Sequence, residues 1–158
     1  MNCTQIANCE ERVKHPKTSL IDPLGGKSNY RLENPTRKPF YKLEFEGCVF
    51  KSQPKGKRCD YGWVEKTKDK MAQSNKVVFI ELKGGNVKEA AEQVLATILA
   101  TENCFKEYKK MARLIYSGKD RPKFSRNSKP YKSLAEKVDY NVNADNLITR
   151  NRFFEEAM

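Results

Sequence analysis

A dense run of β-prone apolar residues, VVFIELKGG, extends from Val77 to Gly85. The run predicts a buried strand that ends at a Gly-Gly turn. Side chains alternate between the faces of a strand, so Glu81 and Lys83 share one face near its carboxyl end. The opposite face, which we expect to point into a helix-covered core, carries Val78, Ile80 and Leu82.

An amphipathic helix is predicted directly after this strand. Asn86 is a good N-cap residue, and Glu89 three residues later completes a capping-box pattern. Apolar residues then recur at helical spacing and form one stripe that should lie against a sheet: Val87, Ala90, Ala91, Val94, Leu95, Ile98 and Leu99. We expect the helix to continue towards Tyr108.

Shorter patterns surround this strand–helix unit. Alternating apolar residues predict strands over 40–50, bent at Gly47, and over 58–66, which together read as a hairpin. Further short elements are a helix over 2–14, a strand over 111–118, a helix over 133–138 and edge strands over 140–142 and 147–153. Residues 15–39 are expected to be an irregular arm, because Pro and Gly punctuate them. The order predicts an α/β domain on a mixed sheet.

Composition indicates one globular domain, 1–158, with a polyanionic partner. The 158 residues carry 31 Lys and Arg against 20 Asp and Glu, a net charge of +11. Such an excess attracts nucleic acid, although a generally basic protein is the alternative reading. No apolar run approaches a membrane span, so no membrane partner is expected.

The cysteines and the N-terminus bear on location. Residues 1–14 lack the apolar region of an export signal, so a cytoplasmic location is expected. Five cysteines without a CxxC pair then read as reduced thiols. A zinc site is the alternative, although its spacing fits no common template; its ligands would be Cys3, Cys9, Cys48 and Cys59.

Acidic residues on neighbouring predicted strands suggest a metal site. Asp60 lies in the strand before Glu81, so the two carboxylates can converge if these strands pair. With the carbonyl of Leu82 they would form a hard oxygen site suited to Mg²⁺ or Mn²⁺. Lys83 could position a water, and the assembly could hydrolyse a phosphodiester.

This pattern resembles the PD-(D/E)XK nuclease superfamily over about residues 40–116. The residues that carry the resemblance are Asp60, a gap of twenty residues, then Glu81, Leu82 and Lys83 at the end of an apolar strand, followed by the helix. The resemblance implies a restriction-endonuclease-like core, with a mixed central β-sheet flanked by helices. It also implies that Asp60 and Glu81 bind the metal and that Lys83 assists the attacking water. Cys59 stands where the family often has proline.

The resemblance suggests two further catalytic residues. Many members carry an acid on the first helix, and Glu10 is the preferred candidate here, with Glu11 and Glu46 as rivals. Some branches place a glutamine on the helix after the lysine strand, a position that Gln93 occupies. Thr97 stands where the RecB-type pattern has tyrosine.

Basic residues near these positions predict nucleic-acid contacts. They fall in the hairpin turn and in a mobile basic loop over 117–133: Lys55, Lys57, Arg58, Lys119, Arg121, Lys123, Arg126 and Lys129. Phe124 or Tyr131 could stack on unpaired bases.

The leading hypothesis is therefore a Mg²⁺-dependent endonuclease that acts on DNA rather than RNA, and a homodimer would suit a duplex substrate. A catalytically inactive nucleic-acid-binding accessory protein of the same fold and an RNA-cleaving member are the alternatives. With little room for a recognition module after the core, weakly specific or structure-directed cleavage is expected.

Overall fold

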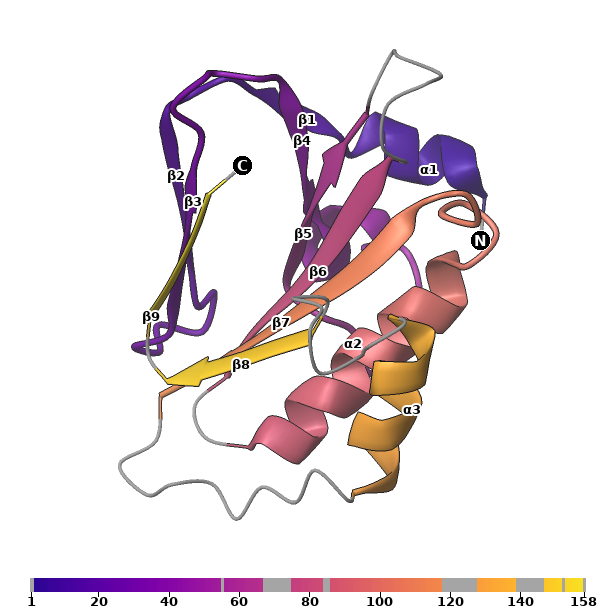
Figure 1. The fold of residues 1–158 in the computed structure, drawn as a ribbon. Helices are drawn as coiled ribbons and strands as arrows, with labels where there is room; N and C mark the ends of the chain where they lie inside the picture. Colours follow the sequence, from indigo (N-terminus) through magenta and orange to yellow (C-terminus); the bar gives the residue numbers. More distant parts are fainter. Residues whose placement is uncertain are drawn as a thin grey trace.

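The strand that carries Glu81 lies inside a mixed six-stranded sheet, which is the larger of two sheets in this α/β protein (Figure 1). The computed structural model describes residues 2–54, 56–66, 75–83, 86–117, 128–138, 147–151 and 153–157, with only the backbone of 150, 151 and 153.

The six-stranded sheet has the order β1-β4-β5-β6-β7-β8. Its strands are β1 (Glu11–Val13), β4 (Phe40–Glu44), β5 (Tyr61–Glu65), β6 (Lys76–Lys83), β7 (Lys109–Tyr116) and β8 (Leu147–Asn151). In this order, β1, β4, β5 and β6 pair antiparallel with their neighbours, whereas β6, β7 and β8 run parallel to one another. Because Tyr61 is registered with Ile80, the start of β5 lies beside the carboxyl end of β6. The condition for Asp60 and Glu81 to converge is therefore met, and the predicted hairpin is present as the antiparallel pair of β4 and β5.

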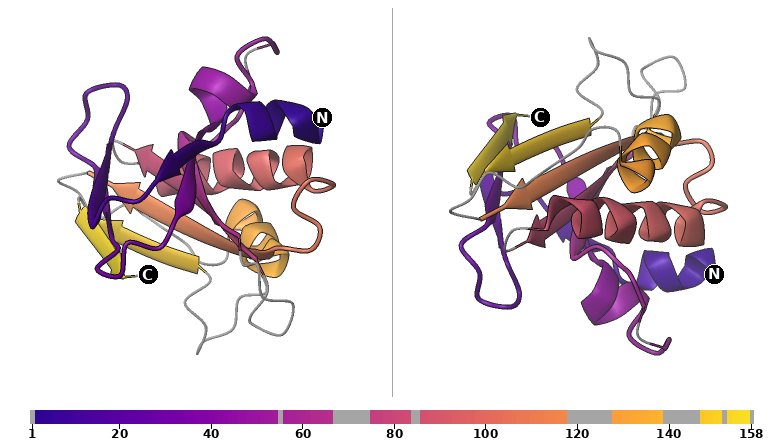
Figure 2. Two further views of the ribbon diagram at one scale, coloured as in Figure 1. Left: turned by 90° about the horizontal axis from the view of Figure 1, so that it is seen from above. Right: turned by 90° about the horizontal axis from the view of Figure 1, so that it is seen from below.

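Helices α2 (Val87–Thr101) and α3 (Lys129–Lys137) lie on one face of this sheet (Figures 1 and 2). The Asn86 cap is confirmed, since its side chain accepts a hydrogen bond of 3.1 Å from the Glu89 amide. The helix ends at Thr101 and is followed by turns over 102–107, so the expected continuation to Tyr108 is wrong.

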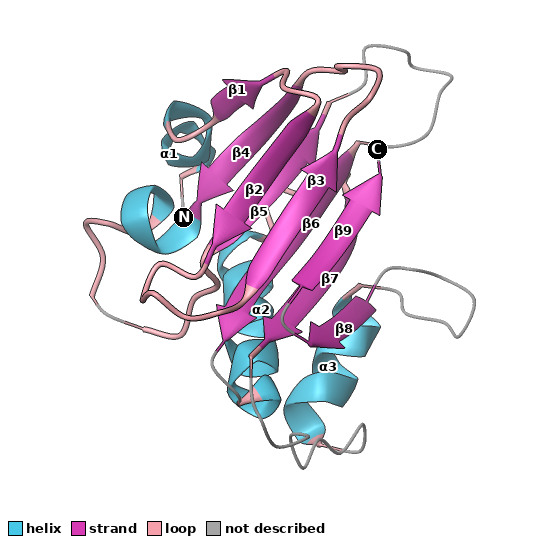
Figure 3. Cartoon of the chain, turned by 90° about the vertical axis from the view of Figure 1, so that its left-hand side faces the viewer, coloured by secondary structure: helices cyan, strands magenta, loops and turns pink. Residues whose placement is uncertain are grey.

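A three-stranded sheet faces the other side of the large sheet (Figure 3). It has the order β2-β3-β9 and consists of β2 (Lys17–Ile21), β3 (Asn29–Glu33) and β9 (Phe153–Ala157). The prediction of an irregular arm over 15–39 is therefore wrong. The Pro and Gly residues delimit two five-residue strands whose inward side chains are buried: Leu20, Tyr30 and Leu32.

The second sheet also reverses the predicted orientation of β6. Val77 and Phe79, on the face of Glu81, pack in the core with α2. The opposite face of β6 packs against β2 and β3, and carries Val78, Ile80 and Leu82. The prediction was wrong because both faces of β6 are covered, so apolar residues on both sides gave no sign of which face the helix takes.

Near the N-terminus, helix α1 (Cys3–Asn8) is shorter than predicted, and residues 11–13 form β1 instead of a helical turn. The strand predicted over 40–50 ends at Glu44 and continues as η1 (Phe45–Val49), a single π-helical turn. Of the basic loop predicted over 117–133, residues 118–127 lie outside the described residues, and residues from 129 onward belong to α3.

Four of the five cysteines form disulfides, Cys3–Cys104 and Cys9–Cys48, and only Cys59 is free. The prediction of reduced thiols is wrong for these four, because the fold brings together residues that lie 101 and 39 positions apart. Two disulfides would be unusual in a reducing cytoplasm. Within the described part of the chain, no helix is long and apolar enough to cross a bilayer.

Candidate active site

The carboxylates of Asp60 and Glu81 are each held by a backbone amide of the neighbouring segment, at the start of β5 and the end of β6. The Asp60 amide donates a hydrogen bond of 3.1 Å to Glu81 Oε2. In return, the Leu82 amide donates one of 2.9 Å to Asp60 Oδ2. The two acids that the sequence pattern selects are therefore brought together at one end of the sheet.

Burial makes this pair electrostatically costly. The Glu81 side chain is 1% exposed, and its Oε1 accepts no hydrogen bond. Burial and then the charge of Asp60 raise the pKa of Glu81 to about 9. Burial, opposed by the Leu82 amide, raises the pKa of Asp60 to about 6. Two carboxylates without sufficient counter-charge are an arrangement typical of functional sites.

Lys83 provides the only nearby positive charge among the described residues that contact Glu81. Its Nζ lies 3.5 Å from Glu81 Oε1 and 3.9 Å from Glu89 Oε1 on α2. The Lys83 carbonyl accepts hydrogen bonds from Ser28 Oγ (2.8 Å) and from the Ser117 amide (2.9 Å). The backbone of Lys83 is thus fixed by two other segments, while its ammonium group remains at the carboxylates.

Helix α2 braces the segment that precedes Asp60. Gln93 Nε2 donates a hydrogen bond of 3.0 Å to the Arg58 carbonyl. Thr97 Oγ1 accepts one of 2.9 Å from the Cys59 amide. Gln93 Oε1 is buried and accepts no hydrogen bond. Gln93 therefore supports the backbone that precedes Asp60, and its described hydrogen bond does not involve either carboxylate.

The acid expected from the first helix is not brought to the site. Glu10 forms an ion pair with Lys66, directly after β5, whereas Asp60 lies just before that strand. Glu46 on η1 is the nearer rival, because its charge contributes to the raised pKa of Asp60. Phe45 at the start of η1 also donates its amide to the Asp60 carbonyl at 3.0 Å.

Sequence reasoning missed Asp22, which directly follows β2. Asp22 is buried. Its charge raises the pKa of Asp60, and this effect is larger than the effect of the Glu46 charge on the same pKa. The residue was overlooked because it lies in the segment predicted to be irregular. The combination of Asp22 with Pro23 and a Gly-Gly pair is a turn signal that could have indicated a hairpin.

Three of the predicted nucleic-acid contacts are described. Lys57 forms an ion pair with Glu92, the Arg58 guanidinium lies 4.4 Å from the centre of the Phe50 ring, and Lys129 begins α3. The other predicted contacts lie outside the described residues: Lys55, Lys119, Arg121, Lys123 and Arg126.

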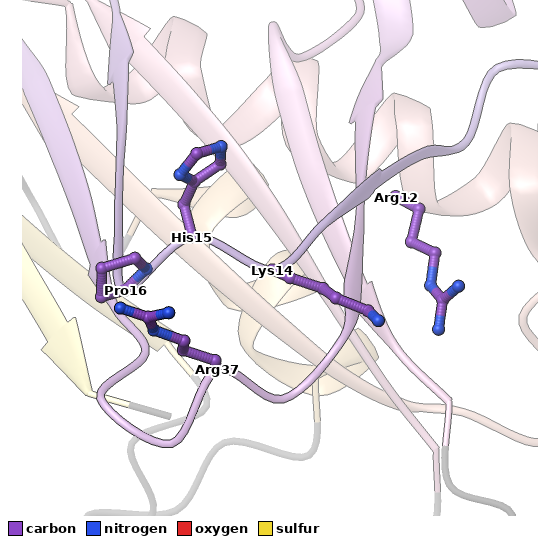
Figure 4. A pocket seen from close by; sticks show the side chains of 5 residues that line it. All are labelled: Arg12, Lys14, His15, Pro16 and Arg37. Carbon is purple, nitrogen blue, oxygen red and sulfur yellow. The ribbon is translucent and has the colours of Figure 1, made fainter.

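A basic pocket of about 450 Å³ was not predicted. It is lined by Arg12, Lys14, His15, Pro16 and Arg37 (Figure 4). The labelled side chains point in different directions and do not converge on one point (Figure 4). Because Arg12 is registered with Tyr41, and Tyr61 with Glu44, the pocket lies at the end of the sheet away from the carboxylates.

The donor set fits a hard divalent cation. Glu81 Oε1 is buried and accepts no hydrogen bond, so it is available as a metal ligand. Asp60 supplies a second carboxylate beside it. The Leu82 amide points to Asp60, and in an extended strand the carbonyl of the same residue points to the same side. Within the described chain, no three residues among His, Cys, Asp and Glu form a metal cluster, so water would complete the coordination.

Comparisons with known proteins give no independent assignment. No family model matches the chain, and neither a search of curated proteins nor a search of solved structures found a match.

Proposed function

We propose that this protein is a metal-dependent nuclease that hydrolyses phosphodiester bonds of DNA by a PD-(D/E)XK-type mechanism. The observation that carries the proposal is the buried Glu81, whose Oε1 lacks a hydrogen bond while Asp60 and Lys83 lie beside it. Lys83 Nζ lies 3.5 Å from that oxygen, which is close enough for an ion pair, but it donates no hydrogen bond to it. In a site that binds a cation and a phosphate group, such an oxygen is available as a metal ligand.

Asp60, Glu81 and the Leu82 carbonyl would hold Mg²⁺ or Mn²⁺. The bound ion supplies Lewis acidity and lowers the pKa of a water molecule. Lys83 Nζ, held near Glu81, is placed to orient the attacking water and to offset negative charge that develops on the phosphoryl oxygens. Gln93, through the Arg58 carbonyl, keeps the backbone before Asp60 in position.

The arrangement of the central elements supports the family resemblance. An antiparallel meander of β4, β5 and β6 is followed by α2 and by the parallel strand β7, and the acids lie where β5 begins and β6 ends. The net charge of +11 favours a polyanionic substrate. DNA is the preferred substrate in this proposal, and a homodimer would match the two-fold symmetry of a duplex.

A cleavage assay tests the proposal. Purified protein is incubated with supercoiled plasmid, linear duplex, branched DNA and single-stranded RNA, each with Mg²⁺, Mn²⁺ or EDTA. We expect metal-dependent cleavage that falls by at least about 100-fold in Glu81→Gln and in Lys83→Met. The matched control is Glu65→Gln, which alters an acid at the opposite end of the same strand pair, where Glu65 lies 3.6 Å from Lys76.

The alternatives give different results in the same assay. Binding without turnover by wild-type protein would favour an inactive accessory protein. A preference for the RNA substrate would favour an RNA-cleaving member. Cleavage that persists at the wild-type rate in both Glu81→Gln and Lys83→Met would exclude this site as the catalytic centre.

A further inference from the structure

Two exposed apolar side chains lie on residues 21–28, defined here as the finger, which comprises the last residue of β2 and the turn that leads to β3. Only three large apolar side chains are exposed among the described residues: Leu24 at 90%, Ile21 at 61% and Leu99 at 49%. The first two lie within four positions of each other on the finger. Exposed apolar residues are common singly, but a pair on one protruding turn suggests contact with another molecule.

The finger is fastened to the candidate active site. Ser28 is fully buried, and its Oγ donates a hydrogen bond of 2.8 Å to the carbonyl of Lys83. The Asp22 amide donates one of 3.3 Å to the Ser28 carbonyl and closes the base of the turn. The charge of Asp22 is also felt by Asp60. The base of the finger therefore lies next to the end of β6 that carries Lys83 and near Asp60.

The tip of the finger is held in one conformation. Asp22 Oδ1 accepts a hydrogen bond of 2.9 Å from the Leu24 amide, and its carbonyl accepts one of 3.0 Å from the Gly25 amide. Gly25 has a φ of 76°, which disfavours any other residue. A Cβ on Gly26 would lie 2.0 Å from Asp22 Oδ2. Since Pro23 further restricts the backbone, the turn presents Leu24 to solvent on a stiff support.

We propose that the finger is a wedge that places Leu24 between bases next to the cleaved phosphate. The inference rests on the proposed function and assigns its substrate class: duplex nucleic acid with a weakened base step, such as a branch, nick or mismatch. Apolar side chains inserted between base steps unstack them at a cost of a few kcal/mol. That cost is least where bases are already unpaired, so the wedge selects such sites.

The exposed charge on the finger is a cation, Lys27, whereas the acid at its base, Asp22, is buried. Lys27 is an exposed cation three positions after Leu24 and can contact a phosphate that flanks the opened step. A second copy of the chain fits less well, because two side chains offer far less apolar area than a stable interface needs. A dimer interface is nevertheless an outcome that the experiment below can reveal.

The test measures base unstacking without relying on cleavage. Glu81→Gln protein in EDTA is mixed with a nicked duplex and with an intact duplex, each carrying 2-aminopurine beside the candidate step. We expect Glu81→Gln protein to raise the fluorescence of the nicked duplex. The rise should be lost in the double variant that also carries Leu24→Ala. We also expect the preference for nicked over intact duplex to fall by about tenfold. Leu99→Ala, an exposed leucine on α2, is the matched control and should change neither.

The outcomes separate this inference from the proposed function. A Leu24-dependent fluorescence rise with no cleavage by wild-type protein would support the wedge and overturn the nuclease. Cleavage by wild-type protein with an unchanged preference in Leu24→Ala would overturn the wedge alone. Leu24-dependent dimerisation on gel filtration without a fluorescence change would replace the wedge with an interface between copies.

Discussion

Two buried ionic clusters lie on opposite faces of the large sheet, and they differ in whether their charges are matched. On the face covered by the small sheet, Arg113 is fully buried and forms an ion pair with Glu156 on β9. On the helix-covered face, Glu81 is as deeply buried, but it shares the charge of Lys83 with a second carboxyl group, that of Asp60.

The cluster around Arg113 is closed by hydrogen bonds. Arg113 Nε donates to Glu156 Oε2 at 2.9 Å, and Tyr30 Oη donates to the same oxygen at 2.7 Å. Trp63 Nε1 donates to Tyr30 Oη at 2.9 Å. Burial and then Glu156 raise the pKa of Tyr30 well above its ordinary value, so the phenol remains a donor. These contacts join β3, β5, β7 and β9 and so hold the two sheets together.

The difference indicates separate roles. A buried charge with a full set of partners contributes to the uniqueness of the fold, and removing one partner is costly. A buried carboxylate with an oxygen that accepts no hydrogen bond lowers the stability of the free protein. A bound cation can offset this loss. Burial alone therefore does not identify a site; the unmatched charge does.

The largest expected effect follows from breaking the matched cluster. Glu156→Ala leaves Arg113 buried without its carboxylate, so we expect the free energy of unfolding to fall by about 3–5 kcal/mol. Urea denaturation at neutral pH measures it. The adjacent Glu155→Ala removes a partly exposed ion pair with Arg31 (3.2 Å) and should cost less than about 1 kcal/mol. An equal decrease in the free energy of unfolding in the two variants would mean that the buried ion pair stabilises the protein no more than the exposed one.

The unmatched cluster should respond in the opposite direction. Glu81→Gln keeps the shape of the side chain and cannot ionise, so folding no longer requires a proton that the unfolded chain has released. We expect the variant to be more stable than wild-type protein in EDTA at pH 8, by about 1–2 kcal/mol. Thermal and urea unfolding measure the change, with Glu65→Gln as the control. A clear loss of stability in Glu81→Gln would show that Glu81 has a structural role.

Dependence on pH and metal sharpens this prediction. Because burial raises the pKa of Glu81 from 4.5 to about 9, the native protein retains a proton that the unfolded chain has released between these values. The free energy of unfolding of wild-type protein should therefore fall as pH rises through this interval, and more steeply than that of Glu81→Gln. Added Mg²⁺ should raise the melting temperature of wild-type protein and leave that of the variant almost unchanged.

The same contrast explains how far the sequence could predict this molecule. The cap at Asn86 and the helical repeat that follows it are local signals, and α2 begins where they indicate. Pairing of Asp60 with Glu81 could be predicted because the two strands are neighbours along the chain. The network of Arg113, Tyr30 and Glu156 could not, because it joins residues up to 126 positions apart.

Two failures of prediction have similar physical causes. Whether Glu81 faces the helix depended on a second sheet built from five-residue strands, which are too short for a clear periodic signal. The position of Glu10 depended on where α1 ends, and the chain turns into β1 only three residues after that helix. In both cases tertiary packing, which a local pattern does not contain, fixed the result.

The smallest expected effect concerns Cys59, the free thiol next to Asp60. Burial, and secondly the charge of Glu81, raise the pKa of Cys59 well above its ordinary value. Since the thiolate is the reactive form, we expect no reaction of native protein with Ellman's reagent at pH 8. The unfolded, unreduced chain should show one thiol, and the reduced chain five. Five thiols before reduction would contradict the two disulfides.

Glu81→Gln then separates the two causes of that inertness. The substitution removes the charge of Glu81 but leaves Cys59 fully buried. Because burial is the larger cause, the reactivity of native Cys59 should rise only slightly and remain far below that of the unfolded chain. A rise to the unfolded level would mean that the carboxylates control access to this part of the sheet. The unmatched cluster would then act on packing as well as on charge, and the contrast with the matched cluster would be weaker.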